Sequence, residues 1–318
     1  MRLLAAPDKF RGTLTAREAA AAIAAGAERA GWSTDELPLA DGGEGTLDVL
    51  GGSNRRTFVT GPLDEPVEAA WQFEEDCTAL IEAAQACGLT LAGGPQRNDP
   101  LRATSRGVGE LVVTAIAEGA RRIVIFVGGV ASTDGGVGAV DALPTPLSVP
   151  LEVACDVDAR FLAAADVFAA QKGATPDQVR ILRERLDQLD VPDLPGSGAA
   201  GGLAGGLAAV GARLVPGFDL VASRLEFDER LAGADLVVTG EGRLDATSFT
   251  GKVVGRVLER AATVGVESLV LAGEVAANSP IDAISLVERY GPERAFVDPA
   301  ECLAELVQNA LAARPAEP

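Results

Sequence analysis

The sequence predicts an α/β protein: a parallel-sheet domain formed by both ends of the chain, with a second mixed α/β domain inserted into it. Near both termini, short apolar segments alternate with helical segments, which is the pattern of a parallel sheet covered by helices on both faces. The middle carries closely spaced short strands joined by turn residues, which favours antiparallel pairing. A length of 318 residues suits about two domains. We therefore expect one domain at 1–52 and 212–318 and the inserted domain at 53–211.

At the N-terminus, the apolar stretch "RLLAAPD" predicts a strand that ends at Asp8. The next stretch, "TAREAAAAIAAGAERAG", predicts a helix, because Thr15 and Glu18 have capping-box spacing and Gly31 is a stop signal. "STDELPLADGG" then predicts a second strand. In the C-terminal part, "ADLVVTGEG", "VESLVLAGE" and "RAFVDP" are predicted strands, and "GKVVGRVLERAATVG" and "SPIDAISLVERYG" are predicted helices.

In the middle of the chain, "RTFVTGPLDEPVEAAWQFEEDCTALIEAA" predicts short antiparallel strands. A helix near 107–120, the buried strand "RRIVIFVGG", the strand "LEVACDV" and a helix near 176–189 follow. The glycine- and alanine-rich stretch "GSGAAGGLAGGLAAVG" closes this part. It contains a GxGxxG pattern, but no strand precedes it, so the pattern does not predict a dinucleotide site.

Composition narrows the classes of partner. The net charge of −19 opposes binding to nucleic acid or to an anionic membrane, because the electrostatic contribution would be repulsive. No long apolar run is free of glycine or charge, and "MRLLAAPDKF" meets Pro7 and charged residues too early for a signal peptide. We therefore expect a cytoplasmic protein without a membrane span. The oligomeric state stays open, with a homodimer as one option.

The absence of histidine from the sequence limits the chemistry. It excludes the catalytic triads that use imidazole as base, and it excludes the usual zinc sites. Proton transfer must therefore rely on other side chains, such as carboxylates. A metal ion should be a hard cation held by oxygen atoms, such as Mg²⁺.

Four stretches share glycines, charged residues and a place at or near the end of a predicted strand: "APDKFRGT" (6–13), "ADGGEGT" (40–46), "GGVASTDGG" (128–136) and "TGEGRLD" (239–245). In open α/β sheets, ligands bind at this edge, where strand-to-helix turns present backbone N–H groups. A single stretch of this kind could be an exposed turn with solvated acids. Four together favour a ligand site.

The charged residues in and near these stretches suit phosphoryl transfer, in which the protein positions groups and neutralises charge. A carboxylate that accepts a hydroxyl proton is a sufficient base for this reaction. For any one acid, a salt-bridge or capping role is an equal alternative. The acidic residues are Asp8, Asp41, Glu44, Asp134, Asp156, Glu241 and Asp245, and the positively charged residues are Arg11, Lys172, Arg243 and Lys252.

The ordered motifs "APDKFRGTLTA", "LPLADGGEGT", "ATSRGVGELV", "GGVASTDGG", "ACDVD", "QKGATP", "GSGAAGGL" and "TGEGRLDATSFTGK" resemble those of the bacterial glycerate kinase family (glycerate 2-kinase, type 1). The resemblance implies a Rossmann- or flavodoxin-like domain with an inserted domain. It also implies ATP and Mg²⁺ as cofactors and phosphoryl transfer to the 2-hydroxyl of D-glycerate. One departure is large: only "PTPLSVP" joins "GAVDAL" to "LEVACDV", where the family carries a longer segment.

With this resemblance and the charges, we assign candidate roles. The candidate catalytic residues are Asp8, Arg11, Asp41, Glu241, Arg243 and Asp245, of which Asp41 and Asp245 are the candidate metal ligands. The candidate substrate- and phosphate-binding residues are Gly42, Gly43, Glu44, Asp134, Gly135, Gly136, Asp156, Lys172, Gly198 and Lys252. Two alternatives remain: a non-catalytic relative that binds a nucleotide or sugar acid, and a kinase for a related hydroxy acid. Because the flanking strands are kept, we expect catalysis to survive the shortened segment, with weak apparent affinity for glycerate.

Overall fold

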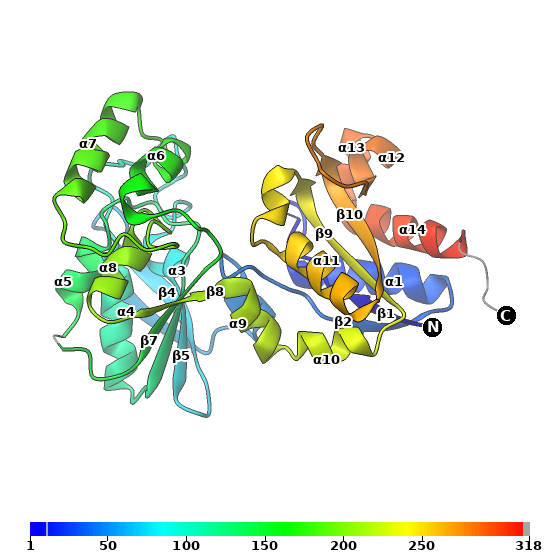
Figure 1. Ribbon diagram of the computed structural model, residues 1–318, viewed down its shortest axis with the longest axis horizontal. Coiled ribbons are helices and arrows are strands. Elements are labelled where there is room, and N and C mark those ends of the chain that lie inside the picture. The colour runs from blue at the N-terminus through cyan, green and yellow to red at the C-terminus, as the bar shows by residue number, and fades with distance from the viewer. Residues whose placement is uncertain (11, 145, 314–318) are drawn as a thin grey trace. The chain divides into compact units, whose positions relative to one another are not determined.

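The computed structural model describes residues 1–10, 12–144 and 146–313, and it divides into two compact units (Figure 1). The terminal unit consists of Met1–Asp41 and Phe218–Pro318, and the inserted unit consists of Gly42–Gly217. Both units are α/β, as the sequence predicts. The domain boundaries predicted at 52/53 and 211/212 stay a prediction.

The terminal unit contains a five-stranded parallel sheet in the order β11-β10-β9-β1-β2. Its strands are β1 (Arg2–Ala5), β2 (Ser33–Glu36), β9 (Leu236–Leu244), β10 (Glu267–Val275) and β11 (Ile284–Ser285). Counted within this unit alone, the order is that of a flavodoxin-like sheet. Its topological switch point lies between β1 and β9, which pair with Leu3 opposite Leu236.

Helices cover both faces of this sheet because alternate strand residues point to opposite sides. Leu3 of β1 packs in a core with residues of α1 (Ala16–Arg29) and α14 (Pro299–Ala312). Leu4 packs in a second core with residues of α10 (Phe227–Ala232) and α11 (Val253–Val264). The remaining helices of the unit are α9 (Gly217–Arg224), which begins at the last residue of the inserted unit, α12 (Leu286–Tyr290) and α13 (Pro292–Val297).

The predicted start of α1 is confirmed: Thr15 and Glu18 form a capping box, in which each side chain accepts a hydrogen bond from the backbone N–H of the other. The helix ends before Gly31, whose φ of +80° suits glycine. Along the same helix, a Cβ on Gly26 would lie 2.2 Å from the carbonyl oxygen of Ala304. The absent side chain therefore lets α1 and α14 pack in close contact.

Two predictions for the C-terminal part are wrong. "RAFVDP" is helix α13 and the start of α14, because Pro292 and Pro299 each stand in the first turn of a helix, where proline's fixed φ is favourable. "SPIDAISLVERYG" is helical only from Leu286, since Ile284 and Ser285 pair with β10. The stretch "TGEGRLD" lies almost wholly in a strand, since residues 239–244 belong to β9 and pair with β10.

The inserted unit contains a six-stranded mixed sheet whose strands lie in chain order. They are β3 (Arg55–Thr60), β4 (Pro66–Phe73), β5 (Thr78–Glu82), β6 (Arg122–Phe126), β7 (Leu151–Cys155) and β8 (Arg213–Pro216). The pairs β3–β4 and β4–β5 are antiparallel, which confirms the prediction for this stretch, and the others are parallel. The predicted boundary places β8 in the terminal domain, yet β8 completes the sheet of the inserted unit.

The helices of the inserted unit are α2 (Thr46–Val49), α3 (Ala83–Cys87), α4 (Arg106–Ala117), α5 (Val137–Ala142), α6 (Ala164–Phe168), α7 (Pro176–Asp187) and α8 (Leu203–Ala209). Trp71, Leu111 and Leu203 belong to the main core, which gathers residues of the sheet, α4 and α8. Phe161 and Leu186 lie in a smaller core of α6 and α7, whose helices lie side by side in Figure 1. Among the described residues, no helix is both long and apolar enough to cross a membrane.

Candidate active site

The first group of candidate residues lies at the carboxyl edge of the terminal unit's sheet. Asp8 follows β1, and its backbone N–H donates to the carbonyl of Gly240 in β9 at 2.9 Å. Glu241 is the next residue of β9, and Asp41 ends the segment that follows β2. These three acids therefore lie near the switch point between β1 and β9, where ligands bind in open α/β sheets.

Asp8 is held in an environment that disfavours its charge. Burial raises the pKa of Asp8 from 3.8 to about 7, and the negative charges of Asp41 and Glu241 add to this increase. The opposing influences come from Lys9, whose charge and whose backbone N–H, donated to Asp8 Oδ1 at 2.7 Å, lower the pKa. A carboxyl group that titrates near neutral pH can both accept and release a proton under ordinary conditions.

Glu241 shares this environment. Burial raises its pKa, and the charges of Asp245 and Asp41 act in the same direction, whereas a hydrogen bond with Ser248 and the charge of Lys252 oppose them. Its Oε1 atom is buried and accepts no hydrogen bond from any residue that the structure describes. A buried acceptor without a donor is unfavourable, so Glu241 Oε1 is a candidate partner for a cation or for a donor group of a ligand.

Asp245 has a different setting at the exposed end of β9. Its Oδ1 accepts hydrogen bonds from the backbone N–H and the hydroxyl of Thr247, at 2.8 and 2.6 Å, and so caps the short 3₁₀ helix Ala246–Phe249. These bonds lower the pKa of Asp245, as do the charges of Lys252 and Arg243. Lys252 donates to the Thr247 hydroxyl at 3.2 Å. The predicted bases Arg243 and Lys252 thus lie near the predicted acid Asp245.

The donor chemistry of this acidic group fits Mg²⁺, which prefers carboxylate oxygens. A cation here would bind Glu241 Oε1. It would also favour the charged form of Asp8 and so lower the pKa of that group. As the side chains are arranged, no three acids within the described ranges are close enough to form a ready metal site. The assignment of Asp41 and Asp245 as metal ligands therefore stays a prediction. Arg11 lies outside the described residues.

In the inserted unit, Asp134 organises the loop between β6 and α5. Its Oδ2 accepts hydrogen bonds from the backbone N–H and the hydroxyl of Ser105, both at 2.8 Å, and from the N–H of Gly138 at 3.3 Å. Its Oδ1 accepts from the N–H of Gly136 at 3.1 Å. Four hydrogen-bond donors of the fold thus hold this carboxylate in place, so Asp134 has a structural role. A role in ligand binding stays a prediction.

Lys172 lies beside this loop and is buried. Its ammonium group donates to the carbonyl of Ser132 at 2.5 Å and lies 3.5 Å from the hydroxyl of Thr133. Burial lowers the pKa of Lys172 to about 8, against the opposing effect of Cys87 and Asp134. The amine therefore positions the strand-to-helix loop from within the unit.

The glycines of the inserted unit allow close contacts between its loops. A Cβ on Gly128 would lie 2.8 Å from the Cα of Gly43, and one on Gly129 would lie 3.5 Å from Oε2 of Glu44. The predicted loops 40–46 and 128–136 therefore meet. Gly135 donates to the carbonyl of Gly201 at 3.1 Å, which joins the second loop to the glycine-rich stretch.

The other predicted residues of this unit have separate surroundings. A Cβ on Gly198 would lie 2.3 Å from the carbonyl oxygen of Arg160, so only glycine fits there. Asp156 accepts from the N–H of Gly217 at 2.9 Å, where α9 begins. Gly42, with φ of +86°, lies beside Gly217, since a Cβ would come within 3.0 Å of the latter's Cα. The two ends of the inserted unit therefore lie together.

Sequence reasoning did not single out Ser105 and Ser248. Both stand in quoted motifs, "ATSRGVGELV" and "ATSFTGK", but a serine before a helix ordinarily signals a cap. Here Ser105 holds Asp134, and Ser248 bonds to Glu241 and accepts from the backbone N–H of Asp245. These partners are distant in sequence or reached across a turn, which no spacing rule reveals.

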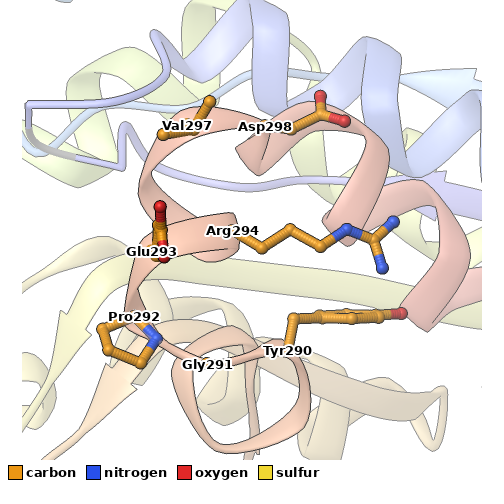
Figure 2. Close-up of a pocket in the computed structure, with 7 residues that line it drawn as sticks. All are labelled: Tyr290, Gly291, Pro292, Glu293, Arg294, Val297 and Asp298. Atoms are coloured by element: carbon orange, nitrogen blue, oxygen red, sulfur yellow. The ribbon is translucent and has the colours of Figure 1, made fainter.

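A cavity of about 540 Å³ lies elsewhere in the terminal unit (Figure 2). It is lined by residues between Tyr290 and Asp298, and the guanidinium of Arg294 lies 4.8 Å from the centre of the Tyr290 ring. Arg294 also forms an ion pair with Glu305 at 2.6 Å. No candidate catalytic residue lines this cavity, so its size alone does not make it the active site.

A flavodoxin-like sheet with acids gathered at its switch point is typical of an α/β enzyme that acts on a small polar ligand. Comparison with known proteins identifies the family. The sequence profile of the glycerate kinase family matches residues 3–148 and 144–312. The two matches overlap at residues 144–148, within "PTPLSVP". The chain belongs to the glycerate kinase family and is an enzyme of that family.

Curated relatives and a solved structure agree with this. The chain is 36% identical to a glycerate kinase of Bacillus subtilis, with 97% of this chain and 96% of the relative covered. It is 36% identical to glycerate 2-kinase of Escherichia coli, with 80% of each covered. The crystal structure of a candidate glycerate kinase 2 from Salmonella typhimurium LT2 matches with a TM-score of 0.78 and 33% identity, covering 98% of this chain and 97% of that one.

Proposed function

We propose that the enzyme transfers the terminal phosphoryl group of ATP to the 2-hydroxyl of D-glycerate and forms 2-phosphoglycerate. The family and the names of the relatives support glycerate as acceptor. The observation that carries the chemistry is the environment of Asp8, a carboxyl group with a pKa of about 7 beside two further acids at the switch point. Cytoplasmic location and a homodimer remain predictions.

Asp8 is the candidate base in this proposal. Its carboxylate accepts the proton of the attacking hydroxyl, and a pKa near the working pH keeps a useful fraction ready for this step. Burial raises the pKa of Asp8, and in the absence of a bound cation the negative charges of Asp41 and Glu241 raise it further. After transfer, the proton on Asp8 returns to solvent, since that group releases protons readily near pH 7.

Asp41 and Asp245 would hold Mg²⁺, which supplies charge neutralisation for the phosphates of ATP when it is bound. Arg243 and Lys252 lie near Asp245, and their N–H groups suit phosphate or carboxylate oxygens. Asp245 keeps its charge at neutral pH, because its hydrogen bonds with Thr247 lower its pKa. In this proposal Asp8 accepts the proton, and Asp245 provides a permanent negative charge.

The test is ADP release at saturating ATP and Mg²⁺ across a titration of D-glycerate, with Asp8→Asn as the blank. We expect glycerate-dependent ADP release, and phosphorus NMR of the product should show the 2-phosphate rather than the 3-phosphate. A panel of related hydroxy acids run in parallel tests the alternative acceptor. A flat response to glycerate from folded protein that binds ATP would contradict the proposal, and a response to another hydroxy acid would replace the acceptor.

A further inference from the structure

A cavity of about 170 Å³ in the inserted unit lies next to the Asp134 loop and has no part in the chemistry described above. Three segments form it: the stretch before α4, the loop that leads into α5, and α7 with the residues after it. Its lining residues are Pro100, Leu101, Ala103, Thr133, Asp134, Val137, Leu182, Arg185, Leu186 and Leu189.

The walls of this cavity are mostly apolar. Seven of its ten lining residues carry hydrocarbon side chains, and the polar ones are Thr133, Asp134 and Arg185. The guanidinium of Arg185 is exposed and donates to the carbonyl of Leu101 at 2.7 Å. A volume of this size holds part of a larger ligand, because sites for whole drug-sized ligands span about 300–1,000 Å³.

Glycerate does not suit this cavity. The molecule carries an oxygen on every carbon and would leave several of these oxygens without partners against the apolar walls. Its carboxylate would also lie beside Asp134, which three backbone N–H groups and one hydroxyl hold as a hydrogen-bond acceptor. Two acceptor-only carboxylates in contact repel each other.

A flat heterocycle meets both conditions, with apolar faces and polar atoms at its edge. We propose that this cavity binds the adenine base of ATP, which rests on the proposed function for ATP as the phosphoryl donor. Asp134 Oδ1 accepts from Gly136 at 3.1 Å, and a carboxylate oxygen has room for a second donor. The exocyclic amine of adenine supplies such a donor.

The polar end of the cavity leads toward the groups that suit the rest of the nucleotide. Thr133 lines the cavity and lies 3.5 Å from the ammonium of Lys172. Gly201 lies against the same amine, since a Cβ there would come within 2.8 Å of Nζ. The base therefore occupies the apolar end, and the ribose and phosphates lie outside the cavity.

A matched pair of valines tests the inference. Val137 lines the cavity, whereas Val113 on α4 does not, and each is 39% exposed. Val137→Trp should narrow the cavity without changing the core, and Val113→Trp is the control. Calorimetric titration with adenosine, tripolyphosphate and ATP then separates base from phosphate recognition. We expect Val137→Trp to weaken adenosine and ATP binding about tenfold or more, which one lost apolar contact region can supply, and to leave tripolyphosphate binding unchanged.

The outcomes separate the inference from the proposed function. If folded Val137→Trp binds adenosine and ATP as tightly as the wild type does, the cavity is not the base site, even if the unmodified enzyme phosphorylates glycerate. Conversely, an unmodified enzyme that fails to use ATP with glycerate overturns the proposed function, while a selective loss of adenosine binding still supports the cavity. Photolabelling of the unmodified enzyme with 8-azido-ATP gives a readout that needs no variant. Labelled peptides within 100–103, 133–137 or 182–189 support the inference, and labels confined to the terminal unit overturn it.

Discussion

Replacing Asp8 by asparagine should make the protein more stable at neutral pH while it abolishes turnover. The native pKa of Asp8 is raised from 3.8 to about 7, so between these values the native state binds a proton that the unfolded chain releases. Stability contributed by this group is therefore full below pH 4 and is lost as pH rises through 7. A difference of about three pKa units corresponds to about 4 kcal/mol at pH 8.

The assay is thermal unfolding of both proteins from pH 4 to pH 8, without divalent cations. Asparagine keeps the shape and can accept the N–H of Lys9 but carries no charge, so the melting temperature of the variant should rise by about 8–16 °C at pH 8, at about 2–4 °C per kcal/mol. The two proteins should agree near pH 4. Asp282→Asn, at an exposed acid of the same unit, is the control and should show no such divergence. A constant difference across the whole pH range would refute the reasoning about Asp8.

Three further changes test other parts of the molecule. Asp245→Asn should reduce turnover about 100-fold or more in the ADP-release assay, with stability kept within about 1 kcal/mol because asparagine also caps helices; near-normal turnover removes Asp245 from the mechanism. Burial lowers the pKa of Lys172 to about 8, so between pH 8 and 10.5 the unfolded chain binds more protons than the native state. The free energy of unfolding of the wild type, measured with denaturant, should therefore rise by about 3 kcal/mol relative to that of Lys172→Met across that window. A constant difference between the two proteins contradicts the buried-amine explanation. Gly26→Ala should lower the melting temperature, because a Cβ would lie 2.2 Å from the carbonyl oxygen of Ala304. The overpacking costs about 1–3 kcal/mol and outweighs a helix-propensity gain of about 1 kcal/mol. A higher melting temperature would show that α1 and α14 separate easily.

The parts of the fold that the sequence predicted correctly depend on local signals. Thr15 and Glu18 mark the start of α1 because a capping box involves only neighbouring residues. The antiparallel strands β3 and β4 are joined by a short turn, and their pairing is therefore also local. The failures occurred where local preference was ambiguous. "RAFVDP" is apolar enough for a strand, and only the prolines at 292 and 299 indicate the helices that form.

For the site, the sequence identified residue types but not their states. Glycine-acid stretches pointed to the carboxyl edge of the terminal unit's sheet, and Asp8 and Glu241 do lie together there. Which acid would hold a proton near neutral pH depends on burial and on charges brought from β9 and from Asp41, which are far along the chain. The hydrogen bonds that hold Asp134 depend in the same way on Ser105, a partner that comes from a different segment of the chain.

The contact between Gly42 and Gly217 has a consequence for how the chain folds. The central strands of the terminal sheet, β1 and β9, pair across the whole inserted unit, and such a long loop is entropically costly to close. Once the inserted unit has folded, its two ends lie within van der Waals distance and it behaves as a short loop. About two halvings of the effective loop length recover about 1 kcal/mol of closure entropy. We therefore expect the inserted unit to fold first, and the sheet that carries Asp8 to assemble only after the last third of the chain has been synthesised.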